Sequence, residues 1–101
     1  MMKTISAKEL DGYVQDGTTL IIDLRSRMEY ADGHIRGAVN VPYGNFKTGF
    51  PGRGEKKILL YCERGSLSLS VARELHMQGY DTISVVGGIR AYRGKNLVRR
   101  R

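Results

Sequence analysis

Residues 58–62 read Ile-Leu-Leu-Tyr-Cys, an apolar run that ends in the only cysteine of the chain. Residues 63–67 read Glu-Arg-Gly-Ser-Leu, and the stretch from Ser68 to Gln78 carries apolar residues at helical spacing. This pattern predicts a buried strand, a short loop and a helix in direct succession. It places Cys62 at the carboxyl end of the strand, facing the amino terminus of the helix.

A helix amino terminus favours an anionic group, because its backbone N–H groups and its dipole both point toward that group. The same position favours the thiolate form of a cysteine, which is the reactive form. A lone cysteine is also commonly a small buried hydrophobe. The position of Cys62 alone leaves both interpretations open, and the neighbouring sequence decides between them.

The length and composition predict one domain over residues 1–101. The chain has 101 residues, of which 41% are hydrophobic, enough for a single core. One cysteine cannot form an internal disulfide, and the amino terminus meets charges at once, without the apolar region of a signal peptide. No apolar stretch approaches the length of a membrane span. We therefore expect a cytoplasmic protein without a membrane partner.

Positive charge is concentrated at the carboxyl end of the chain. The formal net charge is +7, and six basic residues lie between Arg90 and Arg101, where there is no acidic residue. A basic tail can contact nucleic acid or an acidic partner. Because no aromatic stacking platform accompanies this tail, we expect residues 95–101 to be a solvated, frayed terminus and expect no nucleic-acid partner.

Strand and helix patterns alternate along the chain. Apolar and β-branched runs predict strands at 4–5, 19–24, 38–41, 57–61 and 82–86. Capping boxes predict helices that begin at Ser6 and Ser26, the helix at 68–78 follows the loop, and a short helix begins near Ile89. The glycine-rich segment 43–56 holds no clear helix. The alternation predicts an α/β fold with a central parallel sheet covered by helices on both faces.

The predicted helix at 68–78 has an apolar face for packing on the sheet. We expect that face to bury Leu69, Ala72, Leu75 and either His76 or Met77. In open parallel sheets, ligands bind at the carboxyl ends of the strands. Cys62 lies at such an end, so the candidate site is placed there.

Two blocks of this sequence resemble the rhodanese family. The first block comprises Ile22-Asp23-Leu24-Arg25, Glu29-Tyr30 and the run from Gly33 to Pro42. The second comprises Leu60-Tyr61-Cys62, Gly65, Ala72, Leu75, Gly79-Tyr80 and the run from Val85 to Gly88. The resemblance is collinear over about residues 4 to 94 and centres on a strand-ending cysteine. It implies the rhodanese-like three-layer fold, with a central parallel sheet flanked by helices.

The resemblance also implies sulfur transfer by double displacement. Cys62 would accept a sulfane sulfur from thiosulfate or a persulfide, hold it as a cysteine persulfide, and pass it to a thiol or cyanide acceptor. N–H groups of the loop from Glu63 to Ser68 would surround the sulfur, and Gly65 would allow their close approach. The implied partners are a small-molecule donor and acceptor, or a protein acceptor that docks over Cys62. The reaction requires no cofactor and no metal.

The loop departs from the family pattern at its last position. Many rhodaneses carry an arginine there that binds the anionic donor, and this chain has Leu67. Arg64 can supply a cation within the loop, whereas Glu63 opposes anion binding. A persulfide donor is therefore favoured over thiosulfate. Ser68 occupies the position six residues after Cys62, where related phosphatases carry an arginine, so phosphoryl transfer is not expected.

Other polar residues receive supporting or structural roles. Asp23 and Arg25 follow a predicted strand at the same sheet edge, and we expect them to order the loops there by hydrogen bonds. Ser66 is interpreted as a ligand of the persulfide, and Ser68 as a cap of the helix that also borders the site. The two histidines, His34 and His76, are interpreted as structural, because their spacing from Cys62 gives no support to a metal site.

Three functional hypotheses follow, of which the last, a nucleic-acid-binding accessory built on the basic tail, is the least favoured. The first is a single-domain sulfurtransferase that uses a Cys62 persulfide. The alternative is a low-turnover rhodanese-like module with a binding, regulatory or sulfur-relay role. Leu67 favours the alternative, because the loop lacks the donor-binding arginine, whereas the presence of Cys62 favours the enzyme.

Overall fold

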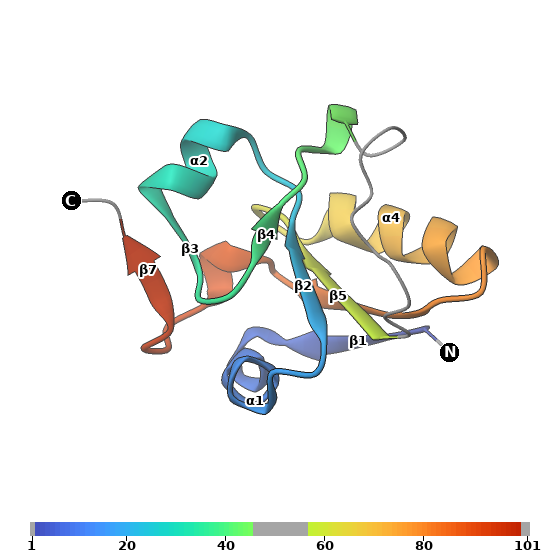
Figure 1. Ribbon diagram of the computed structural model, residues 1–101, viewed down its shortest axis with the longest axis horizontal. Coiled ribbons are helices and arrows are strands. Elements are labelled where there is room, and N and C mark those ends of the chain that lie inside the picture. Colours follow the sequence, from blue (N-terminus) through green and yellow to red (C-terminus); the bar gives the residue numbers. More distant parts are fainter. Residues whose placement is uncertain (1, 46–56, 100–101) are drawn as a thin grey trace.

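The structure is a computed structural model that describes residues 2–45 and 57–99. Its central sheet has five strands in the order β1-β6-β5-β2-β4, and all neighbouring strands run parallel (Figure 1). The strands are β1 (Met2–Ser6), β2 (Leu20–Asp23), β4 (Val39–Asn40), β5 (Lys57–Tyr61) and β6 (Asp81–Val86). The predicted central parallel sheet is confirmed.

Helices cover both faces of this sheet, as the sequence predicts. The α-helices are α1 (Leu10–Asp16), α2 (Arg27–Asp32) and α4 (Ser66–Met77), and short 3-10 helices occupy Ala7–Glu9, Tyr43–Asn45 and Ile89–Ala91. Figure 1 shows α1 and α4 on opposite sides of the strands. Both predicted capping boxes are present, one at Ser6 and one at Ser26. The segment 43–56, in which no clear helix was predicted, begins with the 3-10 helix Tyr43–Asn45, and its residues after Asn45 lie outside the described part of the chain.

Side chains of each strand alternate between two buried clusters. Ile21, Leu59 and Tyr61 pack with Leu10 of α1 on one face of the sheet. The other face carries Ile22, Ile58, Leu60 and Cys62, which pack on Val71, Ala72 and Leu75 of α4. Central strands of a parallel sheet bury both faces, which explains why these strands read as nearly continuous apolar runs. Cys62 therefore continues the face that α4 covers.

The buried face of α4 differs from the prediction at its edges. Ala72 and Leu75 are buried as predicted, and Leu69 is half-buried. His76 and Met77 are exposed, with Met77 at 85%, and Ser68 and Val71 are buried instead. The helix begins at Ser66, two residues before the predicted start, and this earlier start brings Ser68 into its first turn beneath the loop.

The carboxyl-terminal tail is not frayed over its described part, which corrects the expectation for residues 95–101. Strand β7 (Leu97–Arg99) pairs antiparallel with β3 (Gly33–Ile35), a small second sheet that the sequence reading missed (Figure 1). Asn96 anchors its start, since the backbone N–H of Asn96 donates to the Tyr92 hydroxyl at 2.7 Å and its carbonyl accepts from the N–H of Arg36 at 2.8 Å. These backbone contacts order the tail from Asn96 to Arg99.

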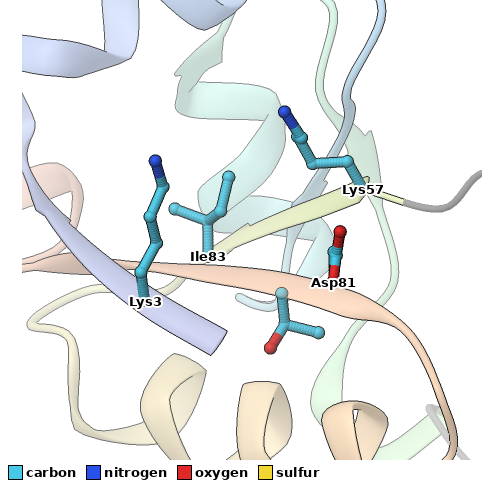
Figure 2. Close-up of a pocket in the computed structure, with 5 residues that line it drawn as sticks. Lys3, Lys57, Asp81 and Ile83 are labelled. Atoms are coloured by element: carbon cyan, nitrogen blue, oxygen red, sulfur yellow. The ribbon is translucent and has the colours of Figure 1, made fainter. Parts of the chain in front are cut away.

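A small hollow lies near the amino ends of the strands, away from Cys62. It has a volume of about 150 Å³ and is lined by Lys3, Lys57, Asp81, Thr82 and Ile83. Figure 2 shows the side chains of Lys3, on β1, and Lys57, on β5, pointing to the same side of the strands as Ile83. Because β5 begins at Lys57 and ends at Tyr61, this hollow and the Cys62 loop lie at opposite ends of the sheet.

Candidate active site

The Cys62 thiol lies between the end of β5 and the first turn of α4, as predicted. Its Sγ accepts hydrogen bonds from the backbone N–H of Gly65 at 3.1 Å and of Ser68 at 3.4 Å. Cys62 is 4% exposed and borders a pocket of about 360 Å³, which we call the Cys62 pocket. Loop residues Glu63, Arg64, Ser66 and Leu67 line this pocket together with Arg25 and Glu29. The sulfur therefore faces a pocket of ligand size with two fixed donors behind it.

The loop is held from behind by the turn at Gly87 and Gly88. The carbonyl oxygens of Cys62 and Glu63 accept hydrogen bonds from the N–H groups of Ile89 at 3.0 Å and Arg90 at 3.2 Å. A Cβ on Gly88, whose φ is +62°, would lie 2.5 Å from both carbonyl oxygens. The carbonyls are thus tied to the turn, and the chain around Cys62 has no room for a side chain at position 88.

Gly65 has the conformation that the loop requires. Its φ is +106°, and a Cβ at this position would lie 2.9 Å from the backbone nitrogen of Gly87. The left-handed region is costly for residues that carry a Cβ. Gly65 caps the amino terminus of α4 and turns its own N–H toward Sγ. The close approach expected for Gly65 is present.

Asp23 and Arg25 form a buried ion pair at the same edge of the sheet. Arg25 Nη2 lies 2.9 Å from Asp23 Oδ2, and the Asp23 carboxylate also accepts from the Arg25 backbone N–H at 2.8 Å. Burial by itself lowers the pKa of Arg25 and is the largest single effect, but the hydrogen bonds to Asp23 and the charges of its surroundings, Asp23 foremost, together outweigh it, so the pKa of the guanidinium is raised. Arg25 Nη2 also donates to the carbonyl of Gly33. The contacts agree with the loop-ordering role predicted for both residues.

Glu63 lies between two arginines at the entrance of the Cys62 pocket. Its Oε1 is 3.7 Å from Nη1 of Arg25, and its Oε2 is 3.7 Å from Nη1 of Arg90. The positive charge of Arg25 is therefore shared between Asp23 and Glu63. Among the described residues, Arg64 has no ion-pair partner, and it is the cation of this pocket that is free to meet a ligand.

Ser66 and Ser68 differ in what their side chains contact. Ser66 is exposed, lines the pocket, and makes no hydroxyl hydrogen bond within the described part of the chain. The Ser68 hydroxyl is fully buried, donates to the carbonyl of Gly65 at 3.0 Å and lies 2.8 Å from the hydroxyl of Ser84. The prediction that Ser68 caps the helix was wrong, since Gly65 holds that position. Ser68 reaches the sulfur through its backbone N–H and not through its hydroxyl.

The family model described as the rhodanese-like domain matches residues 6–95 of this sequence. The chain belongs to the rhodanese-like domain family. A rhodanese-like domain protein from Staphylococcus aureus has a similar crystal structure, with a TM-score of 0.84, 25% identity and coverage of 99% of this chain and 100% of that chain. The fold inferred from the two sequence blocks is thereby confirmed.

Two curated relatives of this rhodanese-like domain are larger proteins. A tRNA sulfurtransferase from Desulfurococcus amylolyticus is 38% identical over 77 residues, which cover 76% of this chain and 15% of that protein. A tRNA uridine(34) hydroxylase from Hamiltonella defensa is 30% identical over 96 residues, which cover 87% of this chain and 27% of that protein. The chain thus spans less than a third of the length of either relative.

The two histidines of the rhodanese-like domain have structural contacts. His34 stacks on the ring of Tyr30 with centroids 3.8 Å apart, and its Nδ1 lies 2.7 Å from the Tyr30 carbonyl oxygen. His76 Nδ1 lies 3.3 Å from the carbonyl oxygen of Tyr80. Within residues 2–45 and 57–99, no three His, Cys, Asp or Glu side chains gather in a way that could hold a metal ion. No described helix is long and apolar enough to cross a membrane.

Three residues at the site of the rhodanese-like domain were not predicted from the sequence. Glu29 belongs to the first sequence block and to the capping box with Ser26, and no site role was predicted for it, yet it lines the Cys62 pocket. Arg90 follows the Gly87-Gly88 turn, which carries it beside Glu63. Ser84 lies inside β6, and its contact with Ser68 joins positions 16 residues apart. Only the turn gave a local signal, since a glycine pair before a short helix marks a tight approach.

Proposed function

We propose that this domain is a sulfurtransferase that carries a sulfane sulfur on Cys62 as a cysteine persulfide. The observation that supports it most directly is the pair of N–H groups, from Gly65 and Ser68, that donate to Cys62 Sγ at the start of α4. Donors already fixed in place stabilise negative charge without having to reorganise. A relative named a tRNA sulfurtransferase supports the same class of reaction.

The proposed reaction has two displacements at sulfur. In the first, the Cys62 thiolate attacks the outer sulfur of a persulfide R–S–SH; the new bond joins Sγ to that sulfur, the bond to R–S breaks, and R–S⁻ leaves with the electron pair. Thiosulfate would react in the same way and release sulfite. In the second, an acceptor thiolate or cyanide takes the sulfur and regenerates the thiolate. Covalent catalysis of this kind divides one difficult transfer into two easier ones.

The charges of the Cys62 pocket favour a persulfide donor over thiosulfate. Leu67 supplies no cation at the end of the loop, and Arg25 already neutralises Asp23 and lies near Glu63. Thiosulfate carries two negative charges, and the Glu63 carboxylate at the entrance repels them. Arg64 is the remaining cation. We infer that a thiol persulfide, which carries less charge at the reacting end, is the better donor.

A low-turnover binding, regulatory or relay module is the second candidate. It is favoured by the low exposure of Cys62, at 4%, and by the pairing of Arg25 with carboxylates. In a relay, the sulfur would load on Cys62 and leave only when a partner protein docks over the pocket. The persulfide would then be stable toward free thiols at low concentration and short-lived in the presence of the partner.

The acceptor and the cellular setting are further parts of the proposal. A reduced, lone Cys62 fits a cytoplasmic setting. The names of both relatives refer to tRNA modification. RNA is therefore an acceptor to test beside thiols, cyanide and proteins, although the sequence alone predicts no nucleic-acid partner. Binding of tRNA at two salt concentrations separates a phosphate contact, which weakens with salt, from no contact at all.

Intact-protein mass spectrometry tests the proposed function. The protein is exposed to thiosulfate or to glutathione persulfide, with Cys62→Ser as the matched control. We expect a gain of one sulfur that requires Cys62 and disappears on addition of dithiothreitol. Absence of that gain with both donors would contradict the proposed sulfurtransferase activity. Slow release to free thiols after normal loading would favour the relay.

A further inference from the structure

A second pocket opens directly beside the Cys62 pocket. It has a volume of about 410 Å³ and shares Arg25, Glu29 and Glu63 with the Cys62 pocket. Its outer wall includes Asp32, Arg90 and Arg99. We call it the charged pocket, because its lining carries three acidic and three basic side chains. The shared lining gives a ligand whose sulfur reaches Cys62 a space into which its remaining atoms can extend.

The small β3–β7 sheet builds the outer wall. Gly33 of β3 is the register partner of Arg99 of β7, and a Cβ placed on Gly33 would lie 3.9 Å from Cγ of Arg99. The Arg99 side chain therefore runs over Gly33, directly after Asp32 at the end of α2. The tail strand thus brings a cation and an anion together at one edge of the pocket.

Most charges in the charged pocket already have partners, but two do not. Arg25 pairs with Asp23, and Glu63 lies 3.7 Å from both Arg25 and Arg90. Glu29 Oε1 accepts from the Ser26 backbone N–H at 3.0 Å. Asp32 and Arg99 form no ion pair with any described residue, while Arg90 is 57% exposed and only loosely paired. The pocket therefore offers one free anion and one free cation, with a second cation beside them.

We propose that the charged pocket binds the body of a small peptidic thiol persulfide that carries one ammonium and two carboxylates. Asp32 accepts the ammonium, Arg99 binds one carboxylate, and Arg90 binds the other. Opposite charges on one ligand match this lining, whereas a simple dianion leaves Asp32 unpaired and is repelled by Asp32 and Glu63. The inference rests on the proposed function of Cys62, whose sulfur exchange with such a donor releases the thiolate of the same peptide.

Donor titrations test this assignment. Sulfur loading of Cys62 is measured against glutathione persulfide and against thiosulfate, for the wild type, Arg99→Gln and Asp32→Asn. Each variant should raise the half-saturating concentration of glutathione persulfide about three- to fivefold, the effect of losing one exposed ion pair. Thiosulfate loading should change less than twofold. Arg73→Gln is the matched control, because Arg73 is an exposed arginine of α4 that lines neither the charged pocket nor the Cys62 pocket.

A binding experiment keeps this inference separate from catalysis. S-methylglutathione cannot transfer sulfur, and its binding to Cys62→Ser protein is followed by the backbone amide signals of residues 32–33 and 97–99. We expect shifts at these positions that weaken in Arg99→Gln. Binding without sulfur loading in the wild type would overturn the proposed function alone. Two results would overturn the assignment of the charged pocket as the binding site. One is normal loading of the wild type with an unchanged half-saturating concentration of glutathione persulfide in Arg99→Gln, and the other is binding of S-methylglutathione elsewhere on the protein.

Discussion

The hydroxyl of Tyr61 donates a 2.7 Å hydrogen bond to Oδ2 of Asp23, its register partner on the neighbouring strand. Both residues are fully buried, and the same hydroxyl accepts the backbone N–H of Ile35 at 3.0 Å. Asp23 in turn holds Arg25 against the Cys62 pocket. One phenol thus connects two strands of the large sheet, the first strand of the small sheet and the positioning of an active-site arginine.

Tyr61→Phe should lower the free energy of unfolding by about 1–3 kcal/mol, measured by urea denaturation. The substitution keeps the ring but leaves the buried N–H of Ile35 without its acceptor and removes a donor from the Asp23 carboxylate. Tyr43→Phe is the matched control, because Tyr43 is 50% exposed and should change stability by less than about 0.5 kcal/mol. Equal losses in both variants would contradict a structural role for the Tyr61 hydroxyl.

The stability of the wild type should fall above pH about 10, in part through Tyr61. Burial raises the pKa of Tyr61 above its ordinary value, and the charge of Asp23 raises it further. In the unfolded chain the phenol ionises near pH about 10, whereas in the folded protein it stays neutral. The stabilisation is therefore fully present below that pH and is lost as the pH rises above it.

Urea denaturation at pH values between about 8 and 11 measures this dependence. Tyr61→Phe should show a shallower alkaline decline than the wild type, because its unfolded state has one phenol fewer to ionise. Burial also raises the pKa of Tyr30 and Tyr92, so part of the decline should persist in the variant. Parallel curves for the two proteins would show that Tyr61 ionises equally in both states.

The elements predicted correctly from the sequence are those set by short-range signals. The apolar run that ends at Tyr61 matches β5, and the capping boxes at Ser6 and Ser26 are both present. Gly17 ends α1 and adopts a φ of +73° there, the left-handed conformation in which glycine commonly ends a helix. In each case one or two neighbouring residues determine the backbone, and no distant partner is needed.

The features that were missed depend on residues far apart in the chain. Strands β3 and β7 have three residues each, too short for a periodic pattern, and they exist because they pair with each other. The start of α4 was also predicted incorrectly. Serine is a preferred capping residue, yet the cap of α4 is Gly65, because the close approach of Gly87 leaves no space for a side chain at position 65. The ion pairs of Glu63 join three separate segments and have no local signature.

Gly88→Ala should destabilise the protein by about 2–4 kcal/mol and slow sulfur loading of Cys62. The added Cβ would lie 2.5 Å from the carbonyl oxygens of Cys62 and Glu63, at a φ of +62° that L residues rarely adopt. The loop must move away from the turn to relieve this contact, and its N–H groups then no longer point toward Sγ. Urea denaturation and the mass assay measure the two effects.

Gly12→Ala serves as the matched glycine control for Gly88→Ala. Gly12 lies inside α1, and a Cβ there meets no atom within 4 Å. Alanine is the better helix former, so this variant should be neutral or more stable by up to about 1 kcal/mol. Normal stability of Gly88→Ala would contradict the tight contact between the turn and the loop.

Glu63→Gln should increase the reactivity of Cys62 toward anionic reagents. The substitution removes a negative charge at the entrance of the pocket. The positive charges of Arg25 and Arg90 are then no longer partly neutralised by Glu63. The rate of alkylation by iodoacetate, an anion, should rise about two- to fivefold relative to neutral iodoacetamide, and the rise should shrink in high salt. Glu74→Gln, an exposed residue of α4 that does not line the pocket, should leave the ratio unchanged. A ratio that is the same in Glu63→Gln and wild type would contradict the electrostatic role of Glu63.

Leu67→Arg should lower the half-saturating concentration of thiosulfate in the sulfur-loading assay by about three- to tenfold. Leu67 lines the Cys62 pocket in the first turn of α4, so an arginine there can reach a donor whose sulfur lies at Sγ. A guanidinium binds an anionic oxygen cluster through paired, charge-assisted hydrogen bonds. Met77→Arg adds the same charge at the far end of the helix, where Met77 is 85% exposed, and should have no effect. If both variants lower the constant equally, net charge and not the position of the cation controls the donor; if neither does, the missing cation at position 67 is not what limits thiosulfate.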